Sequence, residues 1–268
     1  MTGLRLRFYI EGVGVWSPHL AGFPALCEVL AGATPAPPAK APIAAILPPA
    51  ERRRAPACVH LALEVAQQAA AASGRELGML PCVFASSHGD QATTDYMCAT
   101  LAREPLELSP TRFHNSVHNA PAGYWTIAVG CRAASSAVSA GRASFGAGLL
   151  EAGSQALGND EAVLLACADT VGAGPMYEVT DCHEAFGSAL VLSPARGAHT
   201  LARVDLQLIP AHPAYPEPPL PEPLASWRSN NPSAPALALL ALLAQGAGHC
   251  QLAAAPALGL HIDLERMP

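Results

Sequence analysis

Apolar residues along this chain follow two alternating patterns. Short apolar or alternating runs, typical of strands, are separated by longer segments with apolar residues at helical spacing. The predicted strands are 4–15, 79–85, 134–140, 162–168 and 186–192, and the predicted helices are 23–30, 55–73, 92–102 and a segment beginning near 142. This order predicts an α/β fold with a mixed, mostly parallel five-stranded sheet and helices on both faces.

The composition changes after Pro194. Residues 209–223 are dense in proline, which predicts an irregular, extended connection. A helix over 234–244 and a last strand over 258–264 follow. We therefore expect residues 1–194 to form one domain, and residues 195–268 to be a proline-rich connection and a short strand-helix-strand remnant packed on it.

The overall charge argues against some classes of partner. The chain of 268 residues is 51% hydrophobic and 13% charged, with a net charge of −6. Its one basic cluster, residues 52–54, fits either a solvated helix start or a landing site for an acidic carrier protein. We expect no nucleic-acid partner. No uninterrupted apolar run reaches the roughly 18 residues of a membrane span, so none is expected.

The eight cysteines are scattered and form no Cys-x-x-Cys pair. Several lie inside apolar runs. This distribution is typical of buried free thiols in a reducing compartment, so we expect a cytoplasmic protein.

The stretch from Ser109 to Glu151 carries the candidate chemistry. Its small-residue strand ends in Ser-Ala-Gly and runs directly into an apolar helix. Such a turn presents one side chain at a helix N-terminus, where unpaired N–H groups favour an anion or a thiolate. In this chain that side chain is Arg142, or Gly141 if the frame shifts by one, and neither is a nucleophile.

Other reactive side chains have simpler interpretations. His114 and His118 have the spacing of two metal ligands on a helix, but no third ligand is evident, so we expect them in a loop or an interface and predict no metal. Cys182 and His183 are neighbours on an extended chain and point to opposite faces. Ser87 lies in a polar loop after a strand. Cys182 and Ser87 are still the candidates for a hydrolase or acyltransferase.

The central stretch resembles the β-ketoacyl synthases of the thiolase superfamily. Asn119-Ala120-Pro121-Ala122-Gly123 is similar to their Asn-(any)-(any)-Ala-Gly turn, and Phe186-Gly187-Ser188-Ala189 to their Phe-Gly-(any)-Ala turn. In one ungapped frame Arg142 falls on the catalytic cysteine and Ser144 on the serine after it. Nothing from Pro194 onward resembles either catalytic-histidine motif. The run 116–125 and Trp16-Ser17-Pro18 look like the short synthase-like proteins of aryl polyene and xanthomonadin-type pathways.

The resemblance implies a truncated thiolase-like fold and a non-catalytic chain-length factor. Such a subunit forms a heterodimer with an active β-ketoacyl synthase and shapes its acyl tunnel while a polyene grows on acyl carrier protein. No cofactor is implied. Residues expected at the tunnel or interface are Thr111, Arg112, Phe113, His114, His118, Asn119, Ser136, Val138 and Ala140. Residues expected in the vestigial site are Gly141, Arg142 and Ser144.

Two points stay open at this stage. A buried Arg142 needs an acidic partner, and Asp169, Asp181 and Glu184 are equal candidates; alternatively Arg142 is a solvent-exposed residue of the first helical turn. The chain could also be a stand-alone homodimer that binds acyl chains, which differs from the heterodimer in its oligomeric state.

Overall fold

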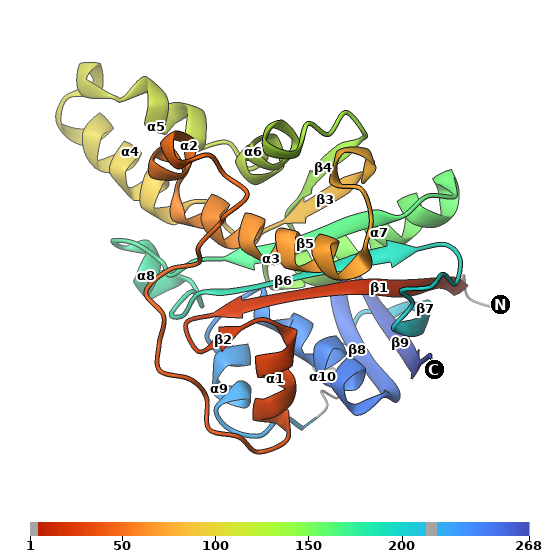
Figure 1. Cartoon of the computed structure of the whole chain (residues 1–268). Coiled ribbons are helices and arrows are strands. Elements are labelled where there is room, and N and C mark those ends of the chain that lie inside the picture. Colours follow the sequence, from red (N-terminus) through yellow and green to blue (C-terminus); the bar gives the residue numbers. More distant parts are fainter. Residues whose placement is uncertain (1–4, 213–218, 268) are drawn as a thin grey trace.

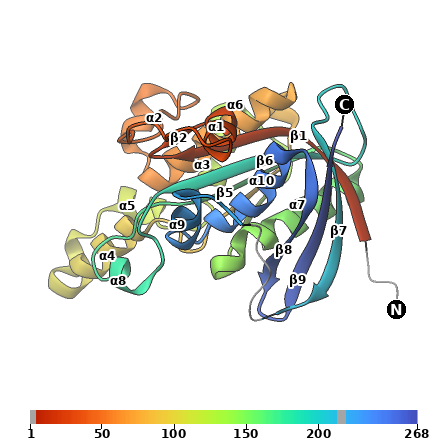
Figure 2. The same cartoon turned by 90° about the horizontal axis from the view of Figure 1, so that it is seen from below.

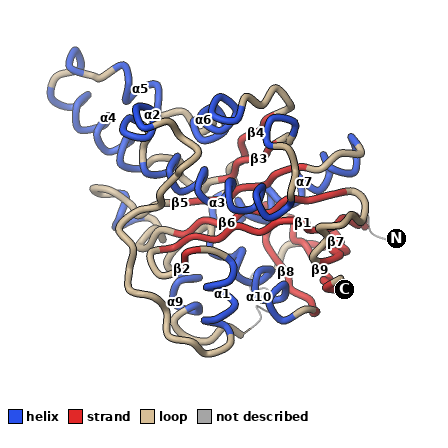
Figure 3. Tube along the Cα trace, in the orientation of Figure 1, coloured by secondary structure: helices blue, strands red, loops and turns tan. Residues whose placement is uncertain are grey.

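A single sheet runs through the molecule (Figures 1 and 3). The computed structural model describes residues 5–212 and 219–267. The sheet is 9-stranded, with order β4-β3-β5-β6-β1-β7-β9-β8 and the short β2 paired to β1. The strands are β1 Arg5–Ser17, β2 Leu20–Ala21, β3 Cys82–Ala85, β4 Ser135–Val138, β5 Val163–Asp169, β6 Phe186–Ser193, β7 Ala202–Pro210, β8 Ala247–Ala255 and β9 Leu258–Arg266.

Helices lie on both faces of this sheet. The α-helices are α1 Phe23–Leu30, α2 Pro49–Arg54, α3 Ala57–Ser73, α4 Gln91–Arg103, α5 Pro110–Asn115, α6 Ala120–Val129, α7 Ser144–Asn159, α8 Met176–Val179, α9 Leu224–Ser229 and α10 Leu237–Gln245. Short 3-10 turns are η1 Leu77–Met79, η2 Pro105–Glu107, η3 Gly141–Ala143 and η4 Ala234–Ala236. α3 and α6 cover one face, and α7 and α10 cover the other.

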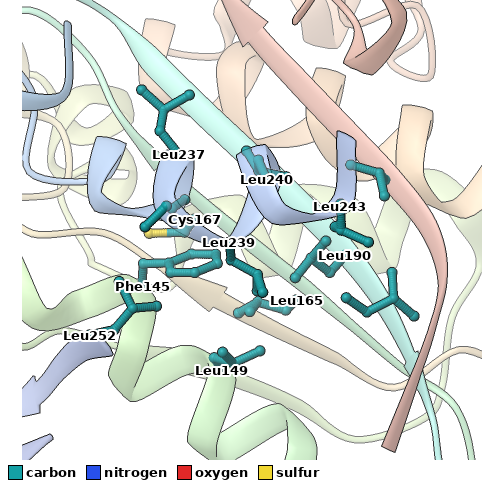
Figure 4. Packing of buried hydrophobic residues seen from close by; sticks show 14 of the residues in the cluster. Phe145, Leu149, Leu165, Cys167, Leu190, Leu237, Leu239, Leu240, Leu243 and Leu252 are labelled. Atoms are coloured by element: carbon teal, nitrogen blue, oxygen red, sulfur yellow. The ribbon is translucent and has the colours of Figure 1, made fainter. Parts of the chain in front are cut away.

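Alternation along the central strands divides the interior into two cores. Leu164 and Ala166 of β5 pack toward α3 and α6, while Leu165 and Cys167 pack toward α7 and α10. Figure 4 shows the second core, where leucines of α10 meet Phe145 of α7. Because both faces of β5 are covered, every residue of the strand is buried, which explains its wholly apolar sequence.

The predicted α/β fold with five central strands is confirmed. β4, β3, β5 and β1 run in one direction and β6 runs against its neighbours, so this part of the sheet is mixed and mostly parallel. In the tail, the predicted helix over 234–244 and the predicted last strand over 258–264 are present as η4 with α10 and as β9, but the prediction missed β7 and β8. β7, β9 and β8 are three antiparallel strands that continue the same sheet past β1. Part of the proline-rich connection, residues 213–218, lies outside the described residues.

The middle of β1 lies unusually close to α3. A Cβ atom on Gly12 would lie 2.0 Å from the carbonyl oxygen of Ala69, and one on Gly14 would lie 2.1 Å from that of Val65. Only glycine allows this approach of strand to helix. Beside it, Arg75 donates two hydrogen bonds of 2.8 Å to the buried carboxylate of Glu11.

α4, η2 and α5 form an arm, residues 91–115, that projects from one end of the molecule (Figures 1 and 2). Tyr96 joins its two helices: the Tyr96 hydroxyl accepts from the Ser109 N–H at 3.2 Å, and the Arg112 guanidinium lies 4.0 Å above the Tyr96 ring. Leu106 and Phe113 are exposed on the arm, at 94% and 57%.

Candidate functional site

The turn from β4 into α7 places residue 142 at the start of a long helix. Gly141 has a positive φ of 57°, which favours glycine, and η3 leads directly into α7. Ser144 is fully buried and holds the turn: its Oγ accepts from the Ala140 N–H at 3.0 Å and lies 2.7 Å from the Gly141 carbonyl oxygen. The predicted strand-turn-helix presentation of Arg142 is therefore present.

Arg142 is surrounded by oxygen acceptors. Its guanidinium donates to Asp181 Oδ2 at 2.9 Å, to the Arg228 carbonyl at 3.1 Å and to the Ser229 carbonyl at 3.4 Å. Of the three acidic candidates, Asp181 is the partner. The side chain is 44% exposed in this chain, so the expectation of a buried arginine is wrong and the alternative of an exposed first-turn residue is correct.

Asp169, at the end of β5, is instead the centre of a buried polar cluster. Its carboxylate, in a residue only 1% exposed, accepts from the Ser86 hydroxyl at 2.8 Å and the Ser87 N–H at 2.9 Å. The Ser233 hydroxyl donates to its other oxygen at 2.5 Å. The carboxylate is thus satisfied by neutral donors, and it fixes the 86–88 loop beside the start of α7.

The structure does not assemble the alternative nucleophiles into a reactive pair. The Cys182 thiol is buried, and burial, with the nearby Asp169 charge, raises its pKa to about 11. The neighbouring His183 ring packs edge-on against Tyr177 at 4.8 Å. Ser87 Oγ is buried and has no hydrogen-bond partner among the described residues. Neither side chain has the base that activation requires.

The two histidines of the central stretch have different surroundings. His114 is exposed on α5, whereas the His118 ring lies 3.1 Å from the Ser86 carbonyl oxygen. Over the described residues no group of three or more metal-ligating side chains comes together.

β4 is an edge strand. It pairs with β3 and, in the described part of the chain, with nothing on its other side. Ser136 and Val138 were expected at the interface, but Ser136 Oγ accepts from Gln155 of α7 at 3.3 Å and Val138 packs against the core. Ser135 and Ala137 are the exposed side chains of this strand, and the sequence interpretation missed them.

A groove of about 470 Å³ lies between α2, α5 and α6. Thr111, His114 and Asn119, three of the residues predicted at the tunnel or interface, line this groove. Arg112 instead contacts Tyr96, and Phe113 is exposed on the arm. The groove is mostly apolar. Apolar or aromatic lining residues that the sequence interpretation missed are Leu47, Pro48, Val117, Ala120, Tyr124, Ile127 and Ala128.

The groove has the character of an unpartnered surface. Ile127 of α6 is 83% exposed and Val117 is 49% exposed. α6, which carries Ile127, also contacts the edge strand β4. Contiguous exposed apolar surface of this kind is typical of a protein–protein interface.

The basic cluster lies on α2, at one side of the groove. Arg54 lines the groove and also lies 3.6 Å from Glu51 of the same helix. Arg53 is exposed, and the Arg52 carbonyl lies 2.7 Å from the His60 ring nitrogen. The Arg52 guanidinium donates to the Ile43 carbonyl oxygen at 3.5 Å, so Arg53 and Arg54 are the exposed arginines of this helix.

Comparison with known proteins identifies the family. The model of the β-ketoacyl synthase N-terminal domain family matches residues 30–215, more than half of the chain. The chain belongs to this family. A search of curated proteins gave no match.

Three solved complexes contain chains with the same fold. One, the ketosynthase ApeO with its chain length factor ApeC from Xenorhabdus doucetiae, is matched at 22% identity and a TM-score of 0.71 over 96% of this chain and 99% of that chain. The type II polyketide synthase complex AntDE:AntF is matched at 12% identity and a TM-score of 0.74, over 98% of this chain and 100% of that chain. The ishigamide ketosynthase/chain length factor is matched at 14% identity and a TM-score of 0.71, over 98% of this chain and 100% of that chain.

All eight cysteines are free thiols, as the sequence predicts. Within the described ranges, no helix has both the length and the apolar character needed to cross a bilayer.

Proposed function

We propose that this chain is a non-catalytic chain-length factor. It pairs with an active β-ketoacyl synthase and shapes the acyl tunnel of that partner while a polyene of the aryl polyene type is elongated on acyl carrier protein. Arg142 stands where the family resemblance places the catalytic cysteine, and a guanidinium cannot form an acyl thioester. The chemistry then belongs to the partner.

The observation that carries the pairing is the open edge of β4. Its exposed side chains, Ser135 and Ala137, are small enough for a second strand to approach closely. The apolar groove is lined in part by α6, which contacts β4. An unpaired edge strand is a template for pairing with another chain. The solved complexes of similar fold that contain a ketosynthase and a chain length factor support this choice of partner.

The arm supplies the contact with the tunnel. Phe113 is exposed at its base and Thr111 faces the groove, so a partner docked along β4 would receive these side chains at its surface. The arginines of α2 are the proposed contact for acidic acyl carrier protein. A cytoplasmic location agrees with eight free thiols, which a reducing compartment preserves.

Co-expression with a β-ketoacyl synthase from the same genome, followed by native mass determination, tests the proposal. We expect a stable one-to-one complex that elongates acyl chains and a ketosynthase that is inactive alone. Within that complex, Phe113→Ala should change the length of the product, while Leu106→Ala at the tip of the arm is the matched control. A symmetric dimer of this chain that ignores the ketosynthase would favour the acyl-binding homodimer. Acylation of Cys182 or Ser87 would favour the hydrolase or acyltransferase.

A further inference from the structure

The tail of the chain lies directly over the start of α7. Residues 228–233, called the clasp here, comprise the last two residues of α9 and the connection from α9 to η4. The carbonyl oxygens of Arg228 and Ser229 accept from the Arg142 guanidinium, and Asp181 accepts from the same group. Residue 142 therefore faces three oxygen acceptors, two of which the tail supplies.

The other end of the clasp is anchored in the interior. Asn231 and Ser233 are fully buried. The Asn231 amide donates to the carbonyl oxygens of Asp169 and Glu184 at 2.8 and 2.7 Å, and its oxygen accepts from the Ser233 N–H at 2.8 Å. Every polar atom of the Asn231 side chain is satisfied, which makes this end rigid.

Between the two ends the clasp follows the segment that leads into β6. The N–H groups of His183 and Glu184 both donate to the Asn230 carbonyl oxygen, at 2.9 and 3.3 Å. The clasp thus joins the start of α7, the end of β5 and the segment before β6, which are the elements that meet at residue 142.

We propose that the clasp closes the vestigial site from within this chain and converts the start of α7 into a seat for a cation, which Arg142 occupies. A helix N-terminus favours an anion, but the carboxylate and two carbonyl oxygens around the Arg142 guanidinium favour a positive charge there. A cysteine at position 142 would remove the guanidinium and leave the Asp181 carboxylate near the helix start without this counter-ion, which disfavours a thiolate. This inference deepens the proposed loss of catalysis at the same residue.

Hydrogen exchange of the full-length chain tests the clasp. Arg142→Met removes the bonds to the Arg228 and Ser229 carbonyls and keeps much of the apolar length. The amides of His183 and Glu184, which donate to the adjoining Asn230 carbonyl, should therefore exchange at least about tenfold faster than in the wild type. Arg142→Lys, which keeps a cation in the seat, should give a smaller increase. The matched control is Arg103→Met, because Arg103 is an exposed arginine whose guanidinium donates to the Ala99 carbonyl oxygen of its own helix. Unchanged exchange in Arg142→Met would overturn the role of Arg142.

Alkylation of Arg142→Cys tests the charge preference of the seat. The exposed native Cys98 is an internal reference in the same sample. The midpoint is the pH at which a thiol reaches half its maximal rate of alkylation by iodoacetamide. The midpoint of the introduced thiol should be no lower than the midpoint of Cys98. A midpoint at least one pH unit lower would mean that the site still stabilises a thiolate, and it would overturn the proposal. Both tests use this chain alone, so their failure leaves the proposed pairing intact, and failure of pairing leaves them intact.

Discussion

The Ser233 hydroxyl donates to the Asp169 carboxylate at 2.5 Å across 64 residues of sequence. This bond joins the tail to the end of β5 in a region where both residues are buried. Ser233→Ala removes one donor to a buried carboxylate, so we expect the free energy of unfolding to fall by about 1–3 kcal/mol. Chemical denaturation monitored by circular dichroism measures this change.

Ser229→Ala is the control for that substitution. The Ser229 hydroxyl is exposed and bonds to Ala225 of its own helix at 3.3 Å, so its removal should change the free energy of unfolding by less than about 0.5 kcal/mol. Equal effects of the two substitutions would show that the buried bond contributes nothing beyond a surface hydroxyl.

The contact between β1 and α3 predicts a severe effect of a single methyl group. In Gly12→Ala the new Cβ would meet the Ala69 carbonyl oxygen at 2.0 Å, and the helix backbone must move. We expect a loss of about 3 kcal/mol or more in the free energy of unfolding. Gly158→Ala in α7, where no atom lies within 4 Å of the added Cβ, should be neutral or stabilising by up to about 1 kcal/mol. Thermal unfolding of both variants tests this difference in stability, and similar melting temperatures would contradict the predicted clash at Gly12.

The buried thiols predict a loss of stability at alkaline pH. Burial, then Asp169, raises the pKa of Cys182 to about 11, above the value of about 8.5 for a thiol in an unfolded chain. As pH rises past about 8.5, the unfolded chain loses this proton while the folded chain keeps it, so stability falls by about 1.4 kcal/mol per pH unit until the pH passes the folded pKa. Below pH 8.5 this thiol contributes no pH dependence.

Urea unfolding between pH 8 and pH 10.5 under reducing conditions measures the slope. In Cys182→Ser the fall of the free energy of unfolding with pH should lose the contribution of one thiol and become shallower. Cys98→Ser, at an exposed position, should leave this slope unchanged. An identical slope in the two variants would mean that Cys182 ionises as easily in the folded chain as in the unfolded one.

The central strands could be predicted because burial leaves a direct trace in the sequence. β5 is covered on both faces, so its run is apolar at nearly every position. β8 leaves little trace, because its four alanines and its glycine have weak strand propensity and its pairing with β9 decides its conformation. β7 does alternate, with Val204 and Leu206 buried beside the more polar Arg203 and Gln207, and that alternation could have identified it.

The site was predictable in position but not in its contacts. The small residues before Arg142 and the apolar helix after it mark the strand-turn-helix. Asn231 and Ser233 have no local signal, because they become important only when the fold brings them against Asp169. Likewise, the sequence of this four-residue strand does not reveal which face is outward: Ser135 and Ala137 are exposed, whereas the predicted interface residues Ser136 and Val138 are half-buried.

The two edges of the sheet provide a matched test of the proposed interface. Ala137 on β4 and Ala247 on β8 are exposed alanines on the opposite edge strands. An arginine on β4 would place a long charged side chain where a partner strand must approach, and burying an unpaired charge costs several kcal/mol. We expect Ala137→Arg to weaken binding to the ketosynthase at least about 100-fold, a loss that corresponds to about 2.7 kcal/mol. Ala247→Arg should leave binding within about threefold of the wild type, because that edge lies at the far side of the sheet.

Isothermal titration calorimetry of the purified subunits measures both variants, after circular dichroism has established that each folds. Equal loss of binding in the two variants would indicate a general effect of added charge, and loss confined to Ala247→Arg would move the interface to β8.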